Sequence, residues 1–196
     1  GRVMAVTLGI SGGLVAVSGS IALIVYQGVV EASICSAAHI SGVTTINVNS
    51  YSNTTADALA AALGGGAAAI NAAAAIAINL TRVDTFIGQG VVISGATTVT
   101  VASDIDSGAE TIILSVAVGG NAVGATVAVT VLHPTVCTYI GVTPTGTVLT
   151  QSQGSGGSVT ASGTVTVKND VSGNATATGL SFAAGASGSF NGTVAL

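Results

Sequence analysis

The sequence predicts an all-β protein, a parallel β-helix (β-solenoid) built from 53-residue tandem repeats. The chain aligns with itself at an offset of 53, and residues 31–50 and 84–103 are identical at eight of twenty positions without a gap. Segments rich in Val, Ile and Thr alternate with Gly, Ser and Asn, which is typical of strands joined by turns. Hydrophobic residues make up 49% of the chain and charged residues only 5%, a composition that excludes disorder.

The repeat extends through the whole chain. Residues 21–25, 74–78 and 127–131 share one phase, and TFIG at 85–88 aligns with TYIG at 138–141. Since 53 residues exceed the usual coil of about 20–30, we expect about two coils per unit and about seven in the chain. The single repeat domain divides into a partial unit at 1–12, units at 13–65, 66–118 and 119–184, and a partial unit at 185–196, with an insert at 142–161 in the third full unit.

The alanine-rich stretch at 58–80 is the element whose conformation is least obvious. Alanine favours helix, and the stretch is apolar and long enough to cross a membrane as a helix. It aligns, however, with residues 111–133, which are rich in β-branched residues and alternate as a strand does. Equivalent positions of a repeat array need equivalent backbone, so we predict strands that pair in parallel with 111–133, and no transmembrane segment. The alternative is a helix of small residues packed on the sheet.

The offset also predicts which side chains stack on one another. Interior positions of a β-helix form ladders of equivalent residues, one from each coil. We expect two interior ladders, the first made of Ile34, Ile87 and Ile140 and the second of Val48, Val101 and Val167.

Three stretches resemble the tandem repeats of giant bacterial surface proteins, the filamentous-haemagglutinin-like and leukotoxin-type filamentous adhesins. VAVTVLHPTVCTYIG and AIAINLTRVDTFIG are similar to that family's apolar strand, polar turn and x-IG element. ISGATTVTVASD is similar to its G-x-VTV-x-A strand. The chain departs from the family in its insert at 142–161 and in its alanine-rich second copy. The resemblance implies a right-handed parallel β-helix in an extracellular fibre, and it implies no active site.

The histidines and the paired carboxylates do not form a pattern that indicates a catalytic site. His39 aligns with Val92 and His133 with Leu80, so the two lie in different phases and have no nucleophile at a recognisable spacing. Glu31 and Asp84 are equivalent and should lie one unit apart along the axis, which is too far for an acid/base pair. We therefore predict no catalytic, cofactor-binding or metal-binding residues, and no enzymatic activity.

Three further aspartates are the only candidate cation ligands. Asp104 and Asp170 are equivalent and Asp106 is close by, but the Gly-Asp nonapeptide pattern of calcium-binding β-helices is absent. The net charge of −4 with three basic residues provides no electrostatic footprint for nucleic acid. Parallel β-helix lyases and hydrolases need clustered Asp, Lys or Arg, and the three basic residues are too widely spaced for that.

The cysteines and the glycosylation motifs also allow alternatives. Cys35 and Cys137 lie two units apart along the axis, so we expect no intrachain disulfide and two free thiols. The insert is either a solvated loop or a protrusion for lateral or ligand contact. Four sequons, which are glycosylation acceptors in secreted proteins, begin at Asn53, Asn79, Asn174 and Asn191.

The sequence therefore favours a non-enzymatic structural segment of an extracellular or cell-surface filament or giant adhesin. Its expected partners are other copies of itself, with cell-surface or glycan ligands as a further class. The alternative is a self-assembling pilus-type subunit that polymerises by β-strand complementation, although that fold predicts no 53-residue repeat. Neither end resembles a cap, so we expect the isolated segment to form filaments or aggregates through its open strand edges.

Overall fold

The computed structural model describes residues 1–141 and 157–196. In these residues the chain forms nine strands and no helix, which confirms the prediction of an all-β protein. The strands are β1 (Arg2–Gly12), β2 (Val15–Tyr26), β3 (Val29–Ile34), β4 (His39–Ser41), β5 (Thr45–Asn79), β6 (Arg82–Ile87), β7 (Val92–Leu132), β8 (Thr135–Ile140) and β9 (Ser158–Ala195).

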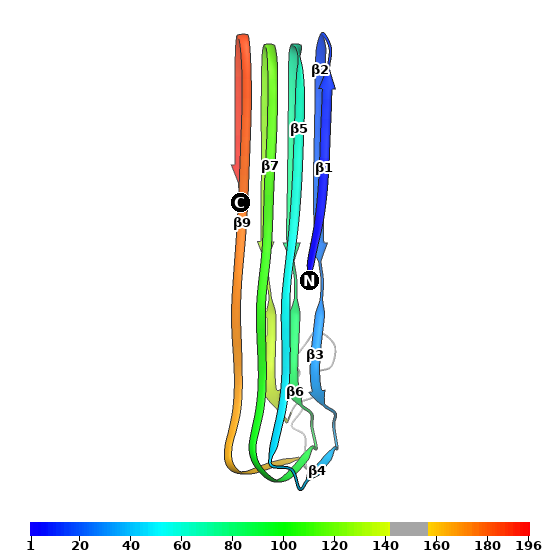
Figure 1. The fold of residues 1–196 in the computed structure, drawn as a ribbon, viewed down its shortest axis with the longest axis vertical. Helices are drawn as coiled ribbons and strands as arrows, with labels where there is room; N and C mark the ends of the chain where they lie inside the picture. Colours follow the sequence, from blue (N-terminus) through cyan, green and yellow to red (C-terminus); the bar gives the residue numbers. More distant parts are fainter. Residues whose placement is uncertain (142–156) are drawn as a thin grey trace.

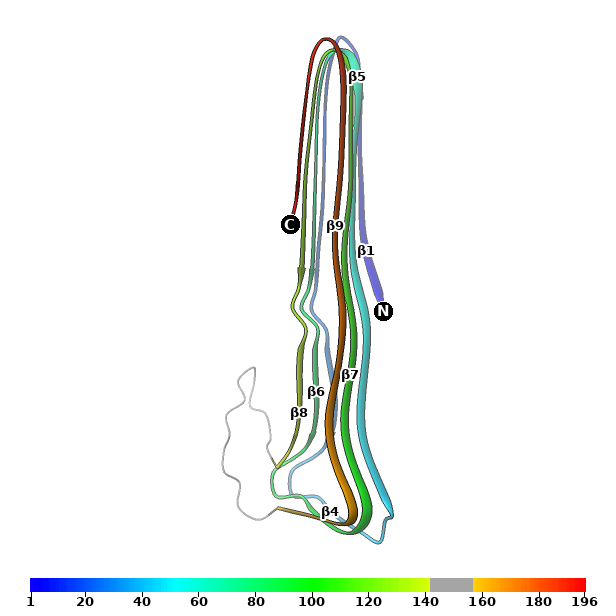
Figure 2. The same cartoon turned by 90° about the vertical axis from the view of Figure 1, so that its left-hand side faces the viewer.

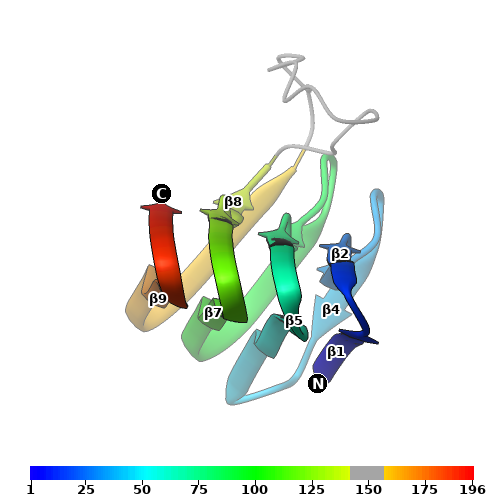
Figure 3. The same ribbon diagram turned by 90° about the horizontal axis from the view of Figure 1, so that it is seen from above.

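The chain is arranged in long, narrow layers that lie side by side (Figure 1). Within a layer it rises along one arm, turns at a narrow apex and descends along a second arm (Figure 2). β1 and β2 are the two arms of the first layer, whereas β5, β7 and β9 run over the apex without interruption. β1 and β2 pair with β5, β5 pairs with β7 and β7 pairs with β9, so the described strands make four layers, which lie side by side in the view from above (Figure 3). A second sheet, in the order β3-β6-β8, continues the descending arms toward the lower end.

All strand pairing is parallel, and each residue pairs with its equivalent in the next layer. Leu8 pairs with Ala61, and Ala61 pairs with Leu114, so the first three layers are related by 53 residues. The architecture is compatible with the predicted β-helix. The expectation of two coils per unit is wrong, however, because one 53-residue unit makes one layer. Each layer takes up so many residues because its two arms are far longer than the usual strand of about 5–6 residues.

The prediction for the alanine-rich stretch is confirmed. Residues 58–79 are part of β5 and pair in parallel with β7, from Ala58 opposite Thr111 to Asn79 opposite Leu132. The parallel ladder gives each backbone amide and carbonyl a partner in a neighbouring layer. That long-range pairing overrides the helix propensity of alanine, which amounts to less than about 1 kcal/mol per residue over β-branched residues.

The third unit resumes the common register earlier than the sequence suggested. β9 begins at Ser158, which pairs with Val92, and Val159 pairs with Ile93. Residues 158–161 therefore belong to the strand and not to the insert, where the sequence had placed them. The register between β7 and β9 shifts around Ala96, which explains why the first residues of β9 did not align at a single offset. Residues 142–156 of the predicted insert lie outside the described residues.

The interior between the two arms changes in character from the lower end to the apex. At the lower end it is aliphatic, and its buried residues are Ile46, Val48, Ile87, Val91, Ile93, Ala96, Val99 and Val101. At mid-height it is lined by hydroxyl and amide groups, such as Thr54, Thr81 and Asn79. Toward the apex the buried apolar side chains are almost all alanine, interleaved with buried polar residues such as Ser20, Asn71 and Ser115. The interior therefore becomes thinner toward the apex.

The two predicted ladders lie in the aliphatic lower part of the interior. Ile87 is 0% exposed and pairs with Ile34 on one side and Ile140 on the other. Val48 and Val101 are likewise buried, and their register is as predicted. Val167 continues the second ladder but is 48% exposed, because it lies in the outermost layer and no further layer covers it.

Glycines form a ladder of their own at the apex. Gly66 pairs with Gly119, and Gly119 pairs with Gly185. A Cβ atom on Gly119 would overlap the carbonyl oxygen of Gly66 in the preceding layer. Only glycine lets successive layers turn this tightly without separating.

Candidate functional site

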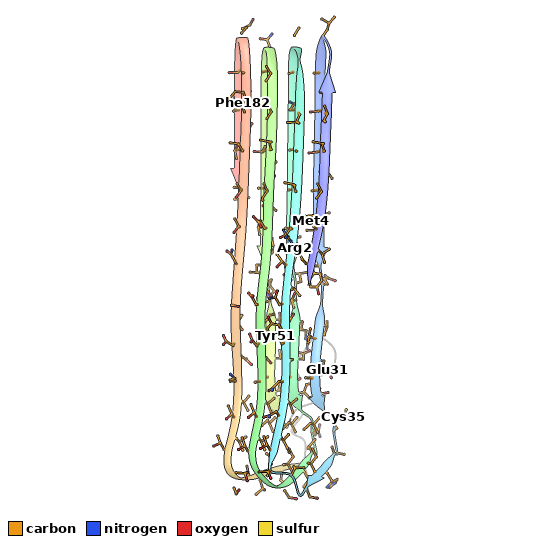
Figure 4. The ribbon with its side chains drawn as sticks, viewed as in Figure 1. Arg2, Met4, Glu31, Cys35, Tyr51 and Phe182 are labelled. Carbon is orange, nitrogen blue, oxygen red and sulfur yellow. The ribbon has the colours of Figure 1, made fainter. Side chains whose placement is uncertain are left out.

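The outer surface of the layers is divided into a charged lower half and a charge-free upper half. The upper half consists of the arms above Asp57 and its register partner Glu110, together with the apex. No charged residue occurs between Arg2 and Glu31, between Asp57 and Arg82, or after Asp170. Figure 4 shows Phe182 in the upper half and Glu31 and Tyr51 in the lower half.

In the upper half, large side chains point outward and small side chains point inward. In β2 the outward positions carry Val15, Val17, Gly19, Ile21, Leu23 and Val25, whereas the inward positions carry Ala16, Ser18, Ser20, Ala22 and Ile24. A water-facing sheet normally places its apolar residues inward and its polar residues outward. The upper half departs from that arrangement, because most of its large apolar side chains point outward.

Some polar groups of the upper interior hydrogen-bond across layers or across arms, whereas the hydroxyls of Thr7, Ser11 and Ser20 have no partner among the described residues. Ser18 donates to the Asn71 side-chain carbonyl over 2.7 Å, and the Asn71 amide donates to the carbonyl of Val116. Thr111 and Thr130 hydrogen-bond between the two arms over 2.9 Å. These hydrogen bonds join the arms across an interior made mostly of small side chains, with Ile24 and Ile113 as larger buried residues.

A shallow apolar groove of about 530 Å³ crosses the outer face of the descending arms in the upper half. Its floor is the ladder of Gly19, Ala72 and Ala125, and its lining includes Ile21 and Val127. The next outward ladder toward the apex is larger, with Val17, Ile70 and Val123 at 64%, 50% and 38% exposure. The face is thus ridged, with a prominent ladder beside a recessed one.

The outer face of the ascending arms in the lower half is polar and acidic. Asp104 pairs with Asp170, as their sequence equivalence predicts, and a hollow of about 440 Å³ lies beside them and Tyr51. Asp106 accepts hydrogen bonds from Ser172 at 3.1 Å and from Asn53 at 3.3 Å. In the residues described, no three His, Cys, Asp or Glu side chains come together as a metal-ligand set.

One buried ion pair lies on the descending arm of the lower half. Arg82 donates to Asp84 over 2.7 Å, and their side chains are 17% and 6% exposed. The hydrogen bond from Arg82 to Asp84 raises the pKa of the guanidinium. Asp84 pairs in register with Cys137, and the adjacent Phe86 stacks on Tyr139 with ring centroids 5.3 Å apart.

This ion pair also acts on the two neighbouring acidic groups. Burial, and next the charge of Asp84, raises the pKa of the Cys137 thiol. The same two causes, in that order, raise the pKa of the Tyr139 phenol to about 12. Both groups are therefore held in their neutral forms at neutral pH, whereas a nucleophilic cysteine needs a lowered pKa. Arg82 satisfies one carboxylate oxygen of Asp84, whereas the other oxygen and the Tyr139 hydroxyl have no hydrogen-bond partner among the described residues.

The other residues that the sequence analysis considered do not come together in one site. His39 and His133 are both exposed, at the lower turn and on a descending arm respectively. Glu31 and Asp84 are register partners in adjacent layers, as predicted, but only Asp84 is buried. One 53-residue unit makes one layer, so these two carboxylates lie in directly neighbouring strands and not two coils apart.

The two cysteines are free thiols, and the four sequon asparagines differ in their exposure. Cys35 is exposed, Cys137 is partly buried, and no disulfide joins them, as predicted. Asn79 is 0% exposed and donates to the carbonyl of Gly108 over 2.9 Å, so its sequon is inaccessible in the folded chain. The remaining three sequon asparagines, Asn53, Asn174 and Asn191, are exposed.

Sequence reasoning missed the outward aliphatic ladders, which are the most unusual surface of the molecule. A signal is present in residues 14–25, LVAVSGSIALIV, where large residues occupy one phase and mostly small residues the other. The described residues include no helix with the length and apolar character needed to cross a membrane. No protein-family model, curated protein or solved structure matches this chain.

Proposed function

We propose that this chain is a non-enzymatic structural segment of an extracellular or cell-surface filament or giant adhesin, and that it is a β-solenoid. One observation carries the proposal: equivalent residues of successive 53-residue units pair in parallel over the length of both arms. In such an array each added unit contributes one more layer, and the assembly grows along a single axis. The resemblance of the repeats to filamentous adhesins supports the extracellular location.

Self-association is the partner class that we propose. Successive layers pair through parallel strand ladders, and a strand edge without a neighbouring layer is a template for another chain or for another repeat. Cell-surface or glycan ligands remain a second partner class in this proposal, for which the polar lower half offers the hydroxyl and carboxylate groups.

The proposal is tested by lengthening the chain. We would insert one, two or three further copies of residues 66–118 directly after Val118, so that every junction keeps the native phase. Each copy should add one layer, or about 4.8 Å, along the stacking direction, which is perpendicular to the arms, with no change in the other two dimensions measured by small-angle X-ray scattering. A chain whose three dimensions all increase would contradict the solenoid.

The open edge of β9 is consistent with a second candidate function, that of a pilus-type subunit that polymerises by β-strand complementation. That function predicts polymers whose length depends on protein concentration. It also predicts that a proline in the outermost strand, Thr166→Pro, abolishes polymerisation. A solenoid segment lengthened by inserted units should instead keep the same length on dilution.

A further inference from the structure

The outer face of the descending arms in the upper half is apolar at nearly every position. We call it the descending face, and it is formed by β2, by residues 68–79 of β5 and by residues 121–132 of β7. Six outward positions in each of these three layers carry Val, Ile, Leu, Ala or Gly, with Asn121 as the one exception. Exposure is 72% for Ile21 in the edge layer β2, and 50% for Ile70 and 43% for Val127 in the two layers behind it.

The descending face is large for an exposed apolar surface. β2 has 12 residues, and at about 3.3 Å per residue and about 4.8 Å per layer the three layers of the face cover roughly 570 Å². This is at the upper end of the about 300–600 Å² that the largest apolar patch of an ordinary monomer covers. Two such faces together provide about 1,100 Å², which reaches the lower limit of about 1,000 Å² for a specific interface.

We propose that a second copy of this chain binds to the descending face, face to face and with its arms antiparallel. The ridge of Val17, Ile70 and Val123 and the groove over Gly19, Ala72 and Ala125 are adjacent ladders, about 6.6 Å apart along the arm. A two-fold axis parallel to the stacking direction and midway between them places the ridge of each copy in the groove of the other. Such a contact is isologous and closes on itself.

This arrangement buries no charge. The antiparallel arms send the charged lower halves of the two copies away from each other, and the charge-free upper halves overlap.

The test uses the full chain and compares one substitution on each outer face. Ile70→Lys places a charge at the centre of the ridge, and Ile112→Lys is its matched control. Ile112 is a middle-layer isoleucine of similar exposure, 43%, on the outer face of the ascending arms. A second variant, Ala72→Phe, fills the groove without adding charge. Circular dichroism establishes that all three variants are folded before they are compared.

Sedimentation velocity between about 1 and 100 µM then measures the dissociation constant of the pair. We expect Ile70→Lys and Ala72→Phe to weaken the pair at least about 100-fold, which corresponds to about 2.7 kcal/mol. The control Ile112→Lys should leave it unchanged. A chain that is monomeric throughout the range would overturn the proposal, as would equal weakening by Ile70→Lys and Ile112→Lys.

Two other results would also overturn the proposal. Association that none of the variants weakens would assign the contact to the open strand edges. Flotation of the monomeric chain with phosphatidylcholine vesicles, lost in Ile70→Lys, would assign the face to lipid. The proposal does not depend on the filament function, because inserted layers would lengthen the stack whether or not two stacks pair.

Discussion

Ile87 is the residue whose replacement most directly tests the layered interior. It is 0% exposed, and it stacks between Ile34 and Ile140 in the lower core. Ile87→Ala removes three buried carbon atoms, worth about 2.4 kcal/mol of transfer free energy at about 0.8 kcal/mol each. The cavity that they leave, with a volume of roughly 80 Å³, costs about 2 kcal/mol more if it does not collapse. We expect the free energy of unfolding to fall by about 2.5–4.5 kcal/mol.

Guanidinium denaturation followed by circular dichroism measures this loss, and Ile112→Ala is the control. Ile112 points outward and is 43% exposed, so the same deletion should cost only about 1 kcal/mol. Ile87→Asp should cost several kcal/mol more than Ile87→Ala, because it leaves a carboxylate without a partner in an aliphatic interior. Equal losses for Ile87→Ala and Ile112→Ala, or a melting curve unchanged by Ile87→Asp, would refute the assignment of inside and outside.

Three further predictions concern the apex, the phenol and the thiols. Gly119→Ala should destabilise the chain by more than the ordinary Gly-to-Ala difference, because its Cβ would overlap the preceding layer; thermal melting measures the loss, and an unchanged midpoint would contradict the tight apex. Asp84→Asn should lower the pKa of Tyr139 from about 12, as followed by ultraviolet absorption with the other two tyrosines replaced by phenylalanine. Because the folded-state pKa of Tyr139 lies above its unfolded value of about 10, the stability it contributes is present below pH 10 and is lost as pH rises toward 12. A thiol reagent at pH 8 should modify exposed Cys35 quickly and Cys137 slowly, and equal rates would contradict the burial of Cys137.

The sequence determined the repeat and the strands. The 53-residue offset identified the partners of Leu8, and it overrode the helix propensity of residues 58–79, because equivalent positions in a stack need equivalent backbone. It also identified Ile87 as a member of a stacked ladder. These features depend only on which positions of successive repeat units are equivalent. Aligning the units with one another identifies those positions directly.

Only the tertiary structure decided how much chain one layer holds and which side of each arm faces inward. Periodicity gives a strand two faces, but in residues 14–25 neither face is charged, so the pattern does not say which is inside. The spacing of the arms decides it: a Cβ atom on Gly9 would lie 2.5 Å from the carbonyl oxygen of Gly19 on the opposite arm. At Gly9 the arms leave room for no side chain at all, and elsewhere near the apex the inward positions carry small residues. Most of the larger Val, Leu and Ile point outward there, although Ile24 and Ile113 are buried between the arms farther from the apex. The outer apolar faces follow from that close approach, which no local feature of the sequence specifies.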